Sequence, residues 1–236
     1  MRPFLILSLI LSLTVSGLSA QKRFVIGWSG GYAFPNELNR ELYIYNAINR
    51  PNLKKEMPLM HWYQGPTLGL HFGDRLYFEL LYSRKRSFAA SEFDSSGVAM
   101  TRQLKVLLNT WNLGLGVKSN GWGIGTSFDF GRYKGKGRRG PESEIKDMDF
   151  QKLWVLDNKR LAGISIYKLT VAETFYIERS FGDFTGLRLY AHIHYTKMQM
   201  DGLDPWLFGR GLNYFVYNEG RFTNLGAMLY FNLGKN

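Results

Sequence analysis

Four histidines are the residues of this 236-residue chain most readily put to catalytic use: His61, His71, His192 and His194. An acyl-transfer site would need one of them beside a hydroxyl nucleophile and an acid. His192 and His194 stand at alternate positions of one predicted strand, and no serine follows either of them two residues on. His61 has no neighbouring serine and acid in the sequence. The histidines therefore do not predict a catalytic triad.

Alternate histidines on a strand can also chelate a metal, because their side chains share a face. No carboxylate can be assigned as a further ligand to His192 and His194, and the chain has no cysteine to supply a thiolate. Two glycine-rich segments, 65–69 and 135–137, suggest phosphate loops but lack the strand and helix that such loops join. We therefore expect neither a bound metal nor a cofactor.

A second set of polar residues falls on the less apolar face of the predicted strands, which in a barrel would face the interior. The set is Glu79, Asp129, Lys168, Arg188, His192 and His194. Buried charges need partners. Glu79 and Arg188 lie at similar distances from their turns, so we expect an ion pair across the barrel. Asp129 and His192 fall at about one height, and the simplest interpretation of the whole set is a structural polar core.

Basic residues form a third set, on the outward face just beyond the apolar series of three consecutive strands. They are Arg84, Arg86, Lys105, Arg132, Lys134 and Lys136. Neighbouring strands would bring them together at the level of the lipid headgroups. Arginine binds phosphate through charge-assisted, often bidentate hydrogen bonds, so the patch predicts binding of lipopolysaccharide. The alternatives are snorkelling of long side chains without a specific ligand, or another anionic partner.

Eight segments of alternating apolar and polar residues must position these three sets. They are residues 24–29, 63–72, 76–83, 100–118, 122–131, 167–177, 187–196 and 222–233. A period of two indicates β-strands. Short turns are predicted at 73–74, 119–121 and 180–183, and longer connections at 33–60, 92–97, 135–159 and 200–220. The predicted fold is all-β, an eight-stranded antiparallel up-and-down transmembrane β-barrel.

The two faces of these segments distinguish a membrane barrel from a soluble one. One face carries tryptophan, phenylalanine and leucine in long series, while the other carries glycine, tyrosine and charged residues. A soluble lipocalin-like barrel would turn the apolar face inward around a ligand. A membrane barrel turns it toward lipid and keeps a filled polar interior. With both termini in the periplasm, the short turns would be periplasmic and the long loops extracellular.

The last predicted strand carries a more specific pattern. Asn224, Gly226, Leu229 and Phe231 supply a polar residue, a glycine, a hydrophobic residue and an aromatic residue in order. In this spacing the strand resembles the terminal signal of bacterial outer-membrane barrels. In fold the chain resembles the small outer-membrane barrels of the OmpX and OmpA-transmembrane kind. In its overall sequence pattern it resembles the outer-membrane β-barrel proteins of Bacteroidota. This resemblance implies insertion by the barrel assembly machinery.

The first twenty residues have the composition of a secretory signal peptide. A basic start at Arg2 precedes about 12 apolar residues, fewer than the ~20 that a spanning helix needs. We expect cleavage after Ala20, with Gly17 as the alternative, which leaves residues 21–236 as one barrel domain. Removing Arg2 leaves 29 basic and 19 acidic side chains. In an exported chain this excess indicates contact with anionic lipids or glycans, not nucleic acid.

We expect a structural or interaction protein of the Gram-negative outer membrane, not an enzyme. One alternative comes from a resemblance in fold to lipid A deacylases and palmitoyltransferases, which would imply an acyl-transfer enzyme. A second is an accessory subunit of an export or uptake complex. Glu173 interrupts the outward face between Val171 and Phe175. Either a bulge near Ala172 turns it inward, or it contacts a partner protein or a lipid-exposed polar group.

Replacing Phe231 by aspartate tests the importance of the terminal strand. Because Phe231 ends the signal-like pattern and faces lipid in the predicted barrel, Phe231→Asp should lower the amount of assembled protein in the membrane. A closed barrel resists detergent until it is boiled, so folded and unfolded forms migrate differently on a gel. Normal membrane levels of the folded variant would remove the assembly role of this strand.

Overall fold

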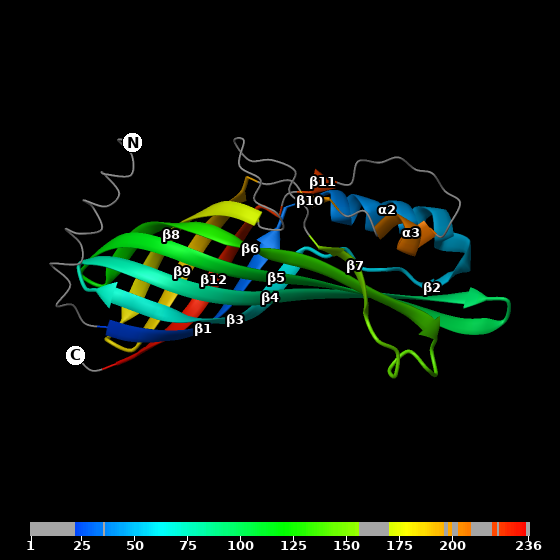
Figure 1. Ribbon diagram of the computed structural model, residues 1–236, viewed down its shortest axis with the longest axis horizontal. Coiled ribbons are helices and arrows are strands. Elements are labelled where there is room, and N and C mark those ends of the chain that lie inside the picture. The colour runs from blue at the N-terminus through cyan, green and yellow to red at the C-terminus, as the bar shows by residue number, and fades with distance from the viewer. Residues whose placement is uncertain are drawn as a thin grey trace.

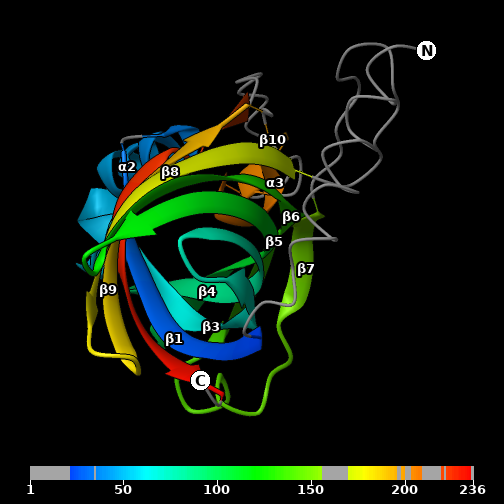
Figure 2. The ribbon, with the colours of Figure 1, turned by 90° about the vertical axis from the view of Figure 1, so that its left-hand side faces the viewer.

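Eight strands of the computed structural model close into an antiparallel barrel. The structure describes residues 22–34, 36–155, 170–195, 198–199, 203–208, 219–220 and 222–234. The barrel strands are β1 (Lys22–Ala33), β3 (Trp62–Gly73), β4 (Leu76–Ser95), β5 (Val98–Ser119), β6 (Trp122–Pro141), β8 (Thr170–Phe181), β9 (Thr185–His194) and β12 (Asn224–Leu233). Each pairs with the next, and β12 returns to pair with β1 (Figure 2). The predicted eight-stranded up-and-down fold is confirmed.

Three tight turns lie at the end of the barrel where β1 begins and β12 ends (Figure 1). They join β3 to β4, β5 to β6 and β8 to β9. Asn120 and Gly121 have φ angles of 50° and 77°, the left-handed backbone that an Asn-Gly hairpin turn adopts. All three short turns predicted from the sequence are confirmed, and they place the longer connections at the opposite end.

Side chains of the barrel strands alternate between outside and inside. On β1 the outward Phe24, Ile26 and Trp28 are 42%, 39% and 51% exposed, while the inward Val25 and Ser29 are each 3% exposed. An apolar exterior around a buried interior with many polar groups is the arrangement of a barrel in lipid. The lipocalin-like alternative, which needs the opposite arrangement, is wrong.

The strands β4, β5 and β6 continue well beyond the barrel and form a three-stranded extension (Figure 1). They contain 20, 22 and 20 residues, whereas the other five barrel strands contain 10 or 12. β4 and β5 stay paired as far as Ser95 and Val98 and turn through Ser96 and Gly97. The predicted loop at 92–97 is therefore wrong, because backbone pairing continues almost to the tip.

The long connections, which the sequence predicted as loops, contain further elements. They are α2 (Glu37–Asn49), the 3-10 helix η1 (Arg50–Asn52), β2 (Leu53–Lys55), β7 (Gln151–Val155), β10 (Met198–Gln199), α3 (Leu203–Phe208) and β11 (Glu219–Gly220). The side chain of Asn36 caps α2 by accepting the Asn39 backbone N–H at 3.1 Å. Neither of the α-helices described is long and apolar enough to cross a membrane.

The helices pack on one side of the extension and enclose a second hydrophobic core outside the barrel. Its buried members include Leu38, Leu42, Tyr45, Leu104, Val106, Leu108, Leu203 and Leu207. The Arg102 guanidinium lies 5.0 Å from the Tyr45 ring and 5.5 Å from the Trp206 ring, and donates to the Leu207 carbonyl at 2.9 Å. Burial lowers the pKa of Arg102 from its ordinary value. We call α2, η1, β2 and α3 the cap.

Inside the barrel, large side chains lie over glycines of neighbouring strands. A Cβ added at Gly116 on β5 would overlap the ring of Tyr77 on β4, and one at Gly125 on β6 would overlap the phenol of Tyr176 on β8. An eight-stranded barrel is only wide enough for its side chains to fill it. The tyrosines fit because the positions that face them have no side chain.

Gly116→Val should prevent closure in most molecules, since the added methyl groups would occupy the space of the Tyr77 ring. The measurement is the fraction of protein that shows heat-modifiable migration after refolding into detergent. Adding Tyr77→Ala to the same chain should restore part of that fraction, because it vacates the space. A single variant that folds as well as the parent would contradict this account of the interior.

Candidate functional site

An ion cluster occupies the interior of the barrel at Arg188 of β9. Its Nη1 and Nη2 lie 2.7 and 2.8 Å from the two carboxylate oxygens of Glu79 on β4. Nη2 and Nε also donate to Glu178 Oε2 on β8, at 2.8 and 3.2 Å. The three side chains are 7%, 2% and 0% exposed. The predicted Glu79–Arg188 ion pair is confirmed, and its bidentate geometry is the strongest form of such a pair.

Glu178 was missed by the sequence analysis, although a signal for it existed. The inward positions of the predicted strand 167–177 include Thr174 and Tyr176, and one more step of two reaches Glu178. The strand continues to Phe181, beyond the predicted end. The Arg188 guanidinium also lies 3.8 Å from the Tyr176 ring centre. One buried cation therefore holds two carboxylates and an aromatic face together.

A second polar network surrounds Asp129 of β6, nearer the cap. The carboxylate accepts from the Ser127 hydroxyl at 2.7 Å and from the Thr174 hydroxyl. Its Oδ2 lies 2.9 Å from His192 Nδ1, so the predicted proximity of Asp129 and His192 is confirmed. Tyr133 completes the network, with its hydroxyl 3.3 Å from His192 Nε2.

The Asp129 network does not have the geometry of a serine-type relay. In such a relay the acid and the nucleophile contact opposite nitrogens of the histidine. Here Thr174 and Asp129 both contact Nδ1 of His192, at 2.9 Å each, and the other nitrogen faces the Tyr133 phenol. The His194 ring packs 4.9 Å from the Tyr133 ring. This arrangement gives no support to the acyl-transfer alternative.

The remaining predicted chemical residues lie apart from these networks. His61 stacks on the Tyr32 ring at 5.0 Å, and its Nδ1 lies 3.2 Å from the Asn39 amide. His71 is buried in the barrel against Tyr77, with ring centres 4.2 Å apart. Lys168 falls outside the described residues. Within the described ranges, no group of three or more histidines and carboxylates could hold a metal ion.

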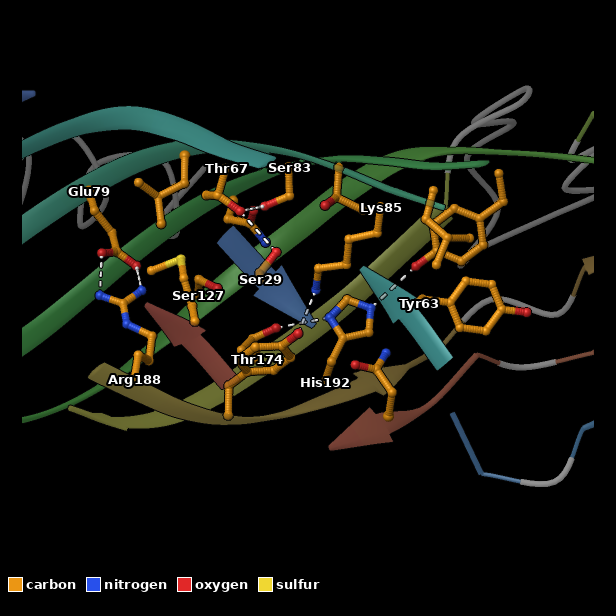
Figure 3. Close-up of a pocket in the computed structure, with 18 residues that line it drawn as sticks. Ser29, Tyr63, Thr67, Glu79, Ser83, Lys85, Ser127, Thr174, Arg188 and His192 are labelled. Atoms are coloured by element: carbon orange, nitrogen blue, oxygen red, sulfur yellow. Dashed lines mark hydrogen bonds and ion pairs between the residues drawn. The ribbon is translucent and has the colours of Figure 1, made fainter. Parts of the chain in front are cut away.

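A small cavity of about 50 Å³ separates the two polar networks (Figure 3). Lys85 enters it from β4 and donates to the Tyr190 hydroxyl at 2.8 Å. The cavity is lined mainly by polar side chains and could hold only a few waters. Toward the cap it ends at Tyr63 and Tyr133, whose rings lie 5.5 and 5.7 Å from that of Phe222.

The six predicted rim residues lie together on the outward face of β4, β5 and β6. Across β4, β5 and β6 the register forms three rows. They are Arg84–Asn109–Arg132, Arg86–Leu107–Lys134 and Phe88–Lys105–Lys136. The next row toward the barrel is aromatic, with Tyr82 paired to Trp111 and Trp111 to Phe130. We call the surface formed by Arg84, Arg86, Lys105, Arg132, Lys134 and Lys136 the basic face.

The basic face carries no acidic partners in the part of the chain that the structure describes. None of its six cations lies within 4.0 Å of a carboxylate oxygen there. The three arginines are exposed and the three lysines are half-buried. Lys152 of β7 also lies beside this face, since it pairs with Lys136. Lys152 was not predicted from the sequence, because the five residues of β7 are too few to show a period.

Glu173 faces outward without a bulge. Its pairing with Phe128 and with Ile193 belongs to registers that show no shift, so the predicted bulge near Ala172 is wrong. The carboxylate accepts from the Thr126 hydroxyl at 3.2 Å and from the Tyr195 hydroxyl at 2.6 Å. Both hydroxyls face outward, so Glu173 contacts lipid-exposed polar groups, as the other alternative predicted. Glu173 also lies near the end of β8 opposite its tight turn, and a charge near the end of a membrane-spanning strand costs less than one at mid-bilayer.

Comparisons with known proteins find weak likenesses in structure alone. No protein-family model matches the chain, and no curated protein is a significant match. Ail, the attachment invasion locus protein of Yersinia pestis, is 9% identical with a TM-score of 0.40, covering 90% of this chain and 96% of its own. Its complex with the heparin analogue sucrose octasulfate gives 7% identity and a TM-score of 0.38, with the same coverage of both chains.

The outer membrane protein OprG from Pseudomonas aeruginosa is 9% identical with a TM-score of 0.41, covering 92% of this chain and 97% of its own. These likenesses are too weak to transfer a ligand or an activity. The closed ring of paired strands by itself defines the barrel.

Arg188→Ala should destabilise the barrel strongly, because it leaves Glu79 and Glu178 buried without their cation. Breaking a buried ion pair on one side costs roughly 3–5 kcal/mol. The triple variant Arg188→Met, Glu79→Gln, Glu178→Gln removes every charge and should unfold at a higher urea concentration than Arg188→Ala. Urea unfolding in lipid vesicles measures both, and equal midpoints would show that the ion cluster is not coupled.

Proposed function

We propose that this chain is an outer-membrane barrel that binds lipopolysaccharide through its basic face. The barrel would lie in the Gram-negative outer membrane, with its turns in the periplasm and its cap outside the cell. Its apolar exterior supports insertion in lipid. The terminal strand β12 closes the ring, and its outward Phe231 is 46% exposed, which supports assembly by the barrel assembly machinery.

A closed interior supports an interaction role over transport. Arg188, Glu79 and Glu178 fill the barrel on one side of the small cavity, and the Asp129 network fills the other side. Tyr63, Phe222 and Tyr133 pack between this cavity and the cap. A solute would have to displace buried ion pairs and a hydrophobic core, so we propose that the barrel is plugged and does not conduct.

The observation that carries the proposal is the order of rows on the basic face. The aromatic row at Tyr82, Trp111 and Phe130 has the composition of an interfacial girdle. Arg84 and Arg132 occupy the next row outward, the level expected for lipid headgroups. Two guanidiniums flanking Asn109, without acidic partners among the described residues, suit the phosphates of an anionic outer leaflet. Snorkelling alone would need neither this clustering nor arginine in particular.

The test is the quadruple variant Arg84→Gln, Arg86→Gln, Arg132→Gln, Lys134→Gln. It should lower the lipopolysaccharide that copurifies with the protein by roughly fourfold or more, since each exposed ion pair contributes about 0.2–1 kcal/mol. Copurifying lipid is quantified by mass spectrometry after extraction in mild detergent. The heat-shift assay should show that the variant still folds.

A matched control removes the same number of charges from the cap: Arg40→Gln, Arg50→Gln, Lys54→Gln, Lys55→Gln. All four are exposed and none belongs to the basic face; Arg40, Lys54 and Lys55 lie beside the carboxylates of Glu37, Asp94 and Glu92. This control should retain lipopolysaccharide at the parent level. Equal retention by both variants would leave snorkelling as the role of the basic face, and equal loss would indicate that net charge alone matters.

A further inference from the structure

The outermost row of the basic face differs in composition from the row nearest the membrane. It contains Phe88, Lys105 and Lys136, directly paired across β4, β5 and β6. Lys152 of β7 pairs with Lys136 and extends the row to a fourth strand. We call Lys105, Lys136 and Lys152 the lysine row. Three lysines therefore occupy paired positions on adjacent strands, whose backbones lie about 4.8 Å apart.

No ion pair within the described residues accounts for the lysine row. Like charges directly opposite one another destabilise a sheet, and none of the three forms an ion pair there. The lysines do not cover the hydrophobic core either, because the cap packs on the other face of the extension. Lys152 is exposed, Lys105 and Lys136 are half-buried, and Phe88 is 54% exposed. Within the described ranges the row is thus accessible to a ligand.

Aromatic rings accompany this row. Phe88 pairs directly with Lys105, and the Phe150 ring lies 5.8 Å from Lys105 Nζ and 4.4 Å from the Arg138 guanidinium. The Phe88 ring is exposed and the Phe150 ring is half-buried, and beside ammonium groups such rings offer a flat apolar surface together with charge. Saccharides that carry acidic groups have both complementary features, C–H faces on the sugar rings and carboxylates or phosphates around them.

Position along the strands separates this row from the headgroup level. Phe88, Lys105 and Lys136 each lie four residues beyond Arg84, Asn109 and Arg132 on the same strand. At about 3.3 Å per residue this is roughly 13 Å along the strands. A phosphate attached to the lipid at the Arg84 level would therefore not reach the lysine row.

We propose that the lysine row binds the acidic groups of the saccharide part of lipopolysaccharide, while Arg84 and Arg132 bind the phosphates on its lipid part. This inference rests on the proposed function and divides its surface into two sites. Arginine suits phosphate, which it binds bidentately, at a fixed depth. Lysine is a point charge on a flexible stem and suits acidic groups whose positions vary along a mobile saccharide.

The experiment titrates the full mature protein in mild detergent with two probes, lipid A and lipopolysaccharide that carries its core saccharide. Native mass spectrometry reports the bound fraction of each. The unaltered protein should bind the core-containing lipid more tightly. Lys105→Gln, Lys136→Gln, Lys152→Gln should weaken binding of that lipid about tenfold, as expected when three exposed ion pairs with the ligand are removed together, and leave lipid A binding unchanged. Arg84→Gln, Arg132→Gln should weaken binding of both probes.

The control Arg50→Gln, Lys54→Gln, Lys55→Gln carries the same change in charge as the lysine variant and should bind both probes normally. Equal weakening of both probes by the lysine variant, or no weakening of either, would overturn the assignment of the saccharide to the lysine row. If the arginine variant changes neither probe while the lysine variant loses only the core-containing lipid, the saccharide site stands and the phosphate site of the proposed function fails.

Discussion

Backbone groups in lipid have no water to bond, so each N–H and C=O of a membrane segment must find its partner within the protein. Pairing of β12 with β1 meets this requirement, because it removes both edges of the sheet at once. Closure then fixes the faces of all eight strands: one set of alternate residues points to lipid and the other into the barrel. The rest of the structure follows from this division.

The interior set has to fill a narrow space without leaving a charge unpaired. Tyrosines meet this need by lying over glycines, as Tyr77 lies over Gly116. Arg188 of β9 meets this need by bridging Glu79 of β4 and Glu178 of β8. Such a cluster satisfies one cation with two carboxylates, and it ties β9 to β4 across the lumen and to its neighbour β8. A barrel whose interior is filled in this way is well suited to present a binding surface on its outside.

The same strand pairing has a different consequence beyond the barrel. β4, β5 and β6 keep their register past the barrel, so the two faces persist while the surroundings change. The inward face no longer borders a lumen and is covered by the cap, with Leu104 and Val106 fully buried. The outward face of the extension carries cations beside Phe88, whereas within the barrel the same face carries mainly apolar residues such as Trp111 and Phe130. The rows of the basic face arise because one register extends through both regions.

Alternation along the chain was sufficient to predict the eight strands, the three short turns and the Glu79–Arg188 pair, because a period of two assigns every residue of a strand to a face. It also placed Arg84, Arg132 and the other four rim cations on one surface, since adjacent strands share their faces. The binding proposed for them goes beyond what alternation can determine.

Only the tertiary structure decided where strands end, so the tip at Ser96 and the reach of β8 to Glu178 were missed. The helices of the cap depend on a core shared with the extension, and Lys152 joins the lysine row through a short strand that only its pairing with β6 defines. Periodicity is a local property, whereas these features depend on contacts between segments that are distant in the sequence.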